Sequence, residues 1–143
     1  MNNHKIYHQL HIQATPDKVF AAISEPSHLE NWWPLRCSGT PMKDAIYNFN
    51  FTEAYNWFGQ VTDIVENQYF KIKMTESDSE WNPTSLSFQL KTQEVGTLLE
   101  FCHKGWKANT SEFRKTSFCW AQLLFGLKQY LEKGVVIPFE ERS

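Results

Sequence analysis

The stretch SEFRKTSFCWAQLLFGLKQYLEKG, from Ser111 to Gly134, has a periodicity that differs from the rest of the chain. Its bulky apolar residues recur at helical spacing, at Phe113, Trp120, Leu124, Leu127 and Leu131. Ser111 is a suitable N-cap and Gly134 a suitable stop, which predicts a helix of about six turns, on the order of 33 Å long at 1.5 Å per residue. A helix of that length can span a sheet.

The segments before this helix read as strands. Apolar and polar residues alternate in IYHQLHIQA (residues 6–14) and then in AIYNFNFTE, YNWFGQVTDIV, YFKIKMT, TSLSFQLKT and TLLEFCHKG, between residues 45 and 105. Alternation indicates a sheet with one buried face and one wet face, because strands covered on both faces are continuously apolar. The sequence therefore predicts an α+β domain in which the C-terminal helix covers the apolar face of an antiparallel sheet.

Two short helices are expected between the first strand and the others. Thr15 can cap the first, and Pro16 suits its opening turn. The second restarts at Ser27 and must end before Pro34, since the residue preceding proline avoids helical dihedral angles. The joint HLENWWPLRC (residues 28–37) therefore places two adjacent tryptophans where the second helix ends.

The composition favours one globular domain with an unusual supply of aromatic rings. A chain of 143 residues, 41% of them hydrophobic, can bury roughly two thirds of its unfolded surface. Aromatic residues make up 15% of the sequence, more bulky apolar surface than an average core of Leu and Val provides. The surplus has to be placed in a dense core or around a pocket.

Charge and cysteine content disfavour several classes of partner. The formal charge of −2 comes from interspersed acids and bases, which gives no electrostatic footprint for nucleic acid or an anionic membrane. No signal peptide and no run of eighteen apolar residues is present, so membrane insertion is not expected. Cys37, Cys102 and Cys119 have neither a C-x-x-C spacing nor an even count. A reducing, cytoplasmic setting is the simplest expectation.

The sequence contains no recognisable motif for a metal, a cofactor or a nucleophile. His4, His8 and His11 are close in sequence, but on a strand His8 and His11 point to opposite faces, and about 13 Å separates His4 from His8. Nucleophile elbows, phosphate loops and dinucleotide fingerprints are absent. We therefore expect no metal, no cofactor and no assigned catalytic residue.

The order of elements resembles the START-like, helix-grip (SRPBCC, Bet v 1-like) superfamily. ATPDKVFAAISEPSHLENWWP (residues 14–34) resembles the opening of its branch of activator of Hsp90 ATPase homologue 1-like proteins, and GTLLEFCHKGW with FCWAQLLFGLKQYLEKG resembles its close. The resemblance implies a single START-like domain over residues 1–143. Its curved seven-stranded antiparallel sheet would grip the long C-terminal helix, and two short helices would help to close a cavity between them.

The aromatic surplus and this resemblance together predict a ligand pocket near the Trp32–Trp33 pair. The apolar candidates share an inward position on their elements: Trp33, Phe49, Phe51, Trp57, Phe70, Met74, Phe88, Phe101, Trp120 and Leu124. His8, His103 and Glu53 are the polar candidates, and the two imidazoles are expected to approach each other if the first and last strands pair. The alternatives are a filled core for the apolar set and exposed strand ends for the polar set.

Three functions stay open at this point. The preferred one is binding of a small hydrophobic or amphipathic molecule between sheet and helix. The first alternative is a protein-interaction module like the co-chaperones of Hsp90. The second is a cyclase- or hydrolase-like enzyme in which His8 or His103 moves a proton. A homodimer is also open.

Overall fold

The computed structural model describes residues 4–142, so residues 1–3 and 143 of the expected domain lie outside the described part. The elements, in chain order, are β1 (His4–Ile12), α1 (Pro16–Ser24), α2 (Pro26–Leu29), β2 (Arg36–Ser38), β3 (Ile46–Thr52), β4 (Tyr55–Val65), β5 (Tyr69–Glu76), β6 (Ser85–Thr92), β7 (Thr97–Trp106), α3 (Ser111–Lys133) and a 3₁₀ turn (Phe139–Glu141). This is the predicted α+β order, with β2 in addition to the strands found from alternation.

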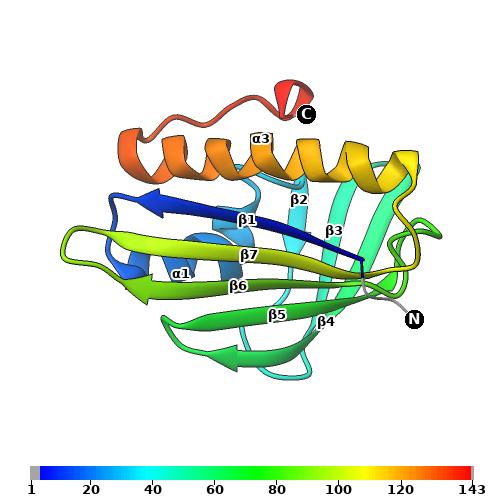
Figure 1. The fold of residues 1–143 in the computed structure, drawn as a ribbon, viewed down its shortest axis with the longest axis horizontal. Coiled ribbons are helices and arrows are strands. Elements are labelled where there is room, and N and C mark those ends of the chain that lie inside the picture. The colour runs from blue at the N-terminus through cyan, green and yellow to red at the C-terminus, as the bar shows by residue number, and fades with distance from the viewer. Residues whose placement is uncertain (1–3, 143) are drawn as a thin grey trace.

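One seven-stranded antiparallel sheet has the order β1-β7-β6-β5-β4-β3-β2. The first and last strands are therefore neighbours, as the helix-grip resemblance implied. Figure 1 shows α3 lying lengthwise against the curved sheet, with the chain after it folding back along the helix. The helix-grip architecture is confirmed. No helix in the described range is long and apolar enough to cross a membrane.

Register explains why one face of the sheet is buried and the other is wet. On β7, Leu99, Phe101 and His103 are all fully buried, whereas Cys102 is half-buried and Lys104 is exposed. Residues directly opposite on neighbouring strands share a face, and the same alternation continues across the sheet. The predicted covering of a single apolar face by α3 is thus correct.

Two predicted helix caps differ from the structure. Thr110, one residue before Ser111, is the N-cap of α3, and its Oγ1 accepts a hydrogen bond from the backbone N–H of Phe113. Thr15 occupies the N-cap position of α1, but its hydroxyl donates to the Asp17 carboxylate instead of capping the backbone. The stop at Gly134 is correct, since this residue has φ of 67°, a left-handed conformation that glycine adopts without a Cβ penalty.

Candidate ligand-binding site

The centre of the sheet–helix interface is packed with side chains that were candidates for lining a cavity. Each of the following is at most 2% exposed: Phe49, Phe70, Met74, Phe88, Phe101, His103, Trp120 and Leu124. The Phe101 ring lies 4.4 Å from the Trp120 ring and 5.1 Å from the Phe88 ring, between ring centroids. These distances are those of rings in contact. The structure therefore brings the candidates together as a filled core.

A hollow remains at one end of this interface, which we call the aromatic groove. It has a volume of about 300 Å³ and lies where the first half of α3 passes the ends of β3 and β4 and the β5–β6 loop. Its lining residues are Trp33, Phe51, Trp57, Trp81, Glu112, Lys115, Thr116, Cys119, Trp120 and Leu123. Four of the expected site residues, Trp33, Phe51, Trp57 and Trp120, thus lie together at an opening.

The groove wall is a continuous set of aromatic rings. Ring centroids are 5.0 Å apart between Trp33 and Trp120, 4.7 Å between Trp57 and Trp81, and 5.1 Å between Phe51 and Trp57. Trp33 and Trp120 are nearly inaccessible, whereas Phe51 and Trp57 are only half-buried. An apolar surface therefore remains in contact with solvent inside a concave site.

Sequence reasoning missed Trp81, which lies in the stretch ESDSEWNP, interpreted as a polar loop. The structure folds this loop inward, and Trp81 is 7% exposed. A lone tryptophan among acidic and polar residues was the signal that could have identified it, since a side chain of that size is rarely left in water.

The opposite wall of the groove comes from α3 and supplies its polar groups. Glu112 and Lys115 are exposed at the rim, and Thr116 and Cys119 lie deeper. The Thr116 hydroxyl donates a hydrogen bond of 3.3 Å to Oε2 of Glu112. The groove therefore has an apolar interior and charges of both signs at its mouth.

His103 is held beneath the groove by a chain of hydrogen bonds. The Trp120 indole N–H donates to Nδ1 of His103 at 3.1 Å, so Nε2 carries the proton and donates to Oγ1 of Thr84 at 2.7 Å. The Thr84 hydroxyl in turn donates to the Trp81 carbonyl oxygen. Burial lowers the pKa of His103 to about 3. The imidazole is neutral and 0% exposed, and both of its nitrogens are hydrogen-bonded, which indicates a structural role.

His8 lies on the same side of the sheet but has a different environment. It stands opposite Phe101 in the register, and its Nε2 is 3.0 Å from the Ser117 carbonyl oxygen on α3. His8 thus ties β1 to the helix, while His103 bonds to Thr84 and Trp120. The first and last strands pair as expected, but the two imidazoles are hydrogen-bonded to different partners and not to each other.

Glu53 differs from the expectation that it points inward. It occupies the exposed two-residue turn between β3 and β4, where the strand ends and the alternation no longer applies. The structure does not bring it to the groove.

The adjacent tryptophans at the end of α2 have separate roles. Trp32 donates its indole N–H to the Ala22 carbonyl oxygen at 2.9 Å and fixes the two short helices to each other. Trp33 turns to the aromatic groove and packs on Phe49, with centroids 4.8 Å apart. One indole therefore fastens the joint, and its neighbour forms part of the groove wall.

Comparison with known proteins gives a family for this fold. Residues 13–132 match the sequence model of the family described as "Activator of Hsp90 ATPase homolog 1-like protein". The chain belongs to this family. A search of curated proteins gives no match.

Solved structures resemble this member of the Activator of Hsp90 ATPase homolog 1-like family over nearly its whole length. The Aha1 dimer from Colwellia psychrerythraea is 29% identical, with a TM-score of 0.84, covering 92% of this chain and 98% of that one. MLL2253 from Mesorhizobium loti is 17% identical, with a TM-score of 0.82 and coverages of 92% and 99%. DynU16, from the dynemicin biosynthetic locus, is 16% identical, with a TM-score of 0.81 and coverages of 92% and 48%. The last two likenesses concern the fold alone.

Proposed function

We propose that the protein binds a small hydrophobic or amphipathic molecule in the aromatic groove. The observation that carries this proposal is the concave surface formed by four indoles and Phe51, where Phe51 and Trp57 retain solvent contact. Ligand sites are typically apolar hollows of about 300–1,000 Å³ with a few polar groups, and this groove is at the small end of that range. Burying the exposed parts of these rings would supply the binding energy.

The chemistry of the groove favours binding over turnover. His103, the titratable ring nearest the aromatic wall, has both nitrogens engaged and is inaccessible. A proton transfer at this ring would have to break the Trp120 or the Thr84 hydrogen bond. Glu112 and Lys115, in contrast, stand at the rim, where they can orient a polar end of a ligand. An amphipathic molecule with its apolar part inside matches this arrangement.

The test uses 8-anilinonaphthalene-1-sulfonate, an amphipathic fluorescent probe. We expect saturable binding near one probe per chain, accompanied by quenching of the intrinsic tryptophan fluorescence. Cys119→Phe fills the groove from the helix side and should weaken binding at least tenfold, as should Trp57→Ala. The control is Tyr7→Ala, which removes an exposed ring on the outer face of the sheet, away from the groove lining, and should leave binding unchanged. Absence of saturable binding, or equal binding by all three variants, would overturn the proposal.

The family description makes a chaperone-binding module the alternative function. Capture of Hsp90 from a lysate at physiological salt, unaffected by Cys119→Phe, would favour that alternative. Capture lost together with probe binding would instead connect the two functions through the groove.

We also propose that the protein self-associates. The relative from Colwellia psychrerythraea was solved as a dimer, and it matches this chain over nearly the full length of both. This chain has large apolar side chains in solvent, among them Phe118 at 67% and Phe125 at 55% exposure. Sedimentation velocity over a range of micromolar concentrations should show a species of twice the chain mass, and a single monomeric species throughout would overturn this proposal.

A further inference from the structure

The outward face of α3 carries an apolar stripe. Phe118 and Phe125 are seven residues apart, two turns of helix, so they lie on one side about 10 Å from each other along the axis. Ala121 and Gln122 are exposed between them. The whole stretch of residues 116–127 contains no charged residue. A solvent-facing helix surface normally alternates charged and polar groups, so this one lacks the pattern of a permanently wet face.

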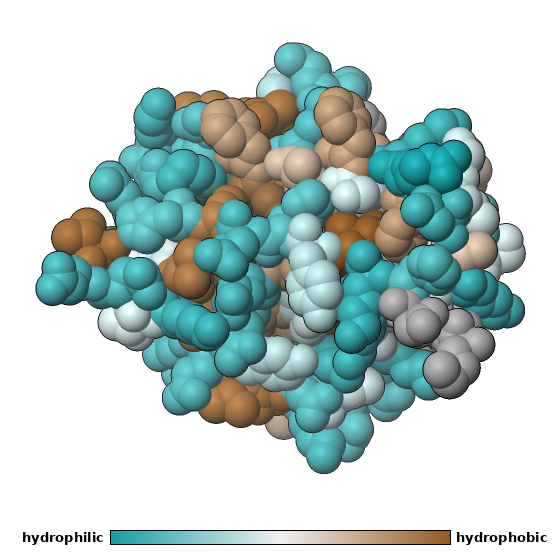
Figure 2. Space-filling model, viewed as in Figure 1, coloured by the Kyte–Doolittle hydropathy of each residue, from teal (hydrophilic) through white to brown (hydrophobic). Residues whose placement is uncertain are grey.

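The chain after α3 extends the same surface. Val135 and Val136 are each 47% exposed, and they follow the helix directly. Figure 2 shows apolar side chains gathered over α3 and the segment that folds back on it, at the top of the view. Exposed apolar side chains therefore occur both on α3 and on the chain that follows it, and a group of such side chains marks an interaction site more often than an isolated one does.

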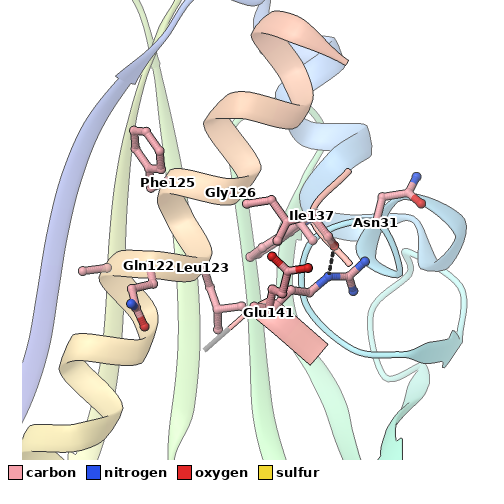
Figure 3. Close-up of a pocket in the computed structure, with 10 residues that line it drawn as sticks. Asn31, Gln122, Leu123, Phe125, Gly126, Ile137 and Glu141 are labelled. Atoms are coloured by element: carbon pink, nitrogen blue, oxygen red, sulfur yellow. Dashed lines mark hydrogen bonds between the residues drawn. The ribbon is translucent and has the colours of Figure 1, made fainter. Parts of the chain in front are cut away.

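A hollow lies beside the stripe, which we call the tail groove. It has a volume of about 380 Å³, and its helix wall includes Gln122, Phe125 and Gly126. Ile137 and Glu141, on the returning chain, contribute to the other wall (Figure 3), as does Arg142 according to the lining of the hollow. A Cβ added at Gly126 would meet Ile137 at 3.5 Å, so the missing side chain leaves space on the floor of the groove.

Hydrogen bonds hold the far wall in place. The Arg142 guanidinium donates from Nε to the Ile137 carbonyl oxygen at 2.8 Å, and from Nη1 to the Pro34 carbonyl oxygen at 3.1 Å. These bonds fasten the returning chain to the segment after α2. These hydrogen bonds therefore stabilise the wall of the tail groove. The Phe118 ring projects from the surface of α3 next to the groove.

We propose that this face binds a second copy of the chain, with the two α3 helices antiparallel and crossing at Ala121 and Gln122. This inference rests on the self-association proposed above and assigns its interface. A two-fold axis at the midpoint between Phe118 and Phe125 brings Phe118 of each copy to the tail groove of the other. Phe118 and the tail groove belong to the same surface of the chain, so the two-fold axis forms the contact between Phe118 and the groove twice. The small side chain of Ala121 permits the close approach of 8–10 Å between axes that packed helices require.

The test is sedimentation velocity with surface variants of equal exposure. Phe118→Asp and Ala121→Arg should raise the dimer dissociation constant at least a hundredfold. The control is Tyr7→Asp on the outer face of the sheet, where Tyr7 is 65% exposed against 67% for Phe118, and it should leave the dimer intact. Circular dichroism verifies that each variant is folded.

The outcomes separate this interface from self-association itself. A wild-type chain that stays monomeric removes both proposals. A dimer that survives Phe118→Asp and Ala121→Arg removes the α3 interface and leaves self-association standing. As a further test, Gln122→Cys should form an intermolecular disulfide across the axis under mild oxidation, while the wild-type cysteines do not. Failure of this variant to cross-link within an intact dimer would overturn the antiparallel crossing.

Discussion

The packed centre of the sheet–helix interface and the aromatic groove are built from the same kinds of residue and differ in what covers them. In the centre, Phe20 of α1 packs edge-on against Phe70, and Trp32 packs edge-on against Phe88, each with centroids 6.4 Å apart. At the groove, Trp33 is the contribution of the α2 joint to the lining. Inward rings interlock where the short helices cover them, and they leave a hollow where the cover consists of α3, the Trp33 indole and the β5–β6 loop.

The largest expected effect is on stability at the centre. Phe101→Ala should lower the free energy of unfolding by about 3–5 kcal/mol, because the ring is fully buried and a cavity would remain. Trp57→Ala, at the half-buried groove wall, should cost only about 1–2 kcal/mol, since part of that ring is already in water. Urea denaturation followed by circular dichroism measures both, and equal losses would break the comparison between the two regions.

A second prediction concerns pH. His103 has a folded pKa of about 3, below the unfolded value of 6.5, so between these values the unfolded chain binds the proton and the folded one does not. Its contribution to stability is therefore complete above about pH 6.5 and declines as the pH falls towards 3, with a limiting slope of about 1.4 kcal/mol per pH unit.

His103→Gln should remove this component, leaving a shallower dependence of unfolding free energy on pH than in the wild type. Urea titrations at several pH values between 4 and 7 measure the difference. Parallel profiles for the two proteins would show that the imidazole is accessible to protons in the folded state.

A smaller effect is expected at the start of α3, which frames the groove. Thr110→Ala should cost about 1 kcal/mol, since it removes the acceptor for the Phe113 N–H. Ser111→Ala is the matched control and should change stability by only a few tenths, because Ser111 is not the cap. Thermal denaturation measures the loss of stability in each variant. A larger loss for Ser111→Ala than for Thr110→Ala would show that Ser111 is the N-cap.

The smallest effect is predicted for Glu53→Gln. This residue lies in the exposed β3–β4 turn beyond the groove, so stability should stay within about 0.5 kcal/mol of the wild type. Binding of the anilinonaphthalene probe should also be unchanged in a fluorescence titration. A clear loss of binding would extend the site to the turn.

Much of the fold was readable from the sequence because it depends on local pattern. Alternation placed Phe49 and Phe101 inward, and helical spacing set the extent of α3 almost to the residue. β2 was not found, since three residues, Arg36–Ser38, are too short to show a period, and this strand depends on pairing with β3.

The site was less predictable because the periodicity of apolar residues indicates only which face of a strand or helix a side chain lies on. Whether Phe88 or Trp57 meets a partner ring depends on segments far away in the chain, such as Trp32 on the joint and Trp81 in its loop. The tail groove was missed for the same reason. It exists through Arg142 and Ile137, which follow the last helix in a stretch without a secondary-structure pattern.

The close spacing of the indoles has a spectroscopic consequence. Trp57 and Trp81 are 4.7 Å apart and Trp33 and Trp120 are 5.0 Å apart, so their electronic transitions are coupled. Exciton coupling of this kind gives paired bands of opposite sign in the ultraviolet dichroism, and their amplitude depends on the angle between the rings. A ligand that tilts either indole pair should therefore change the circular dichroism of the protein, so binding can be followed without an attached dye.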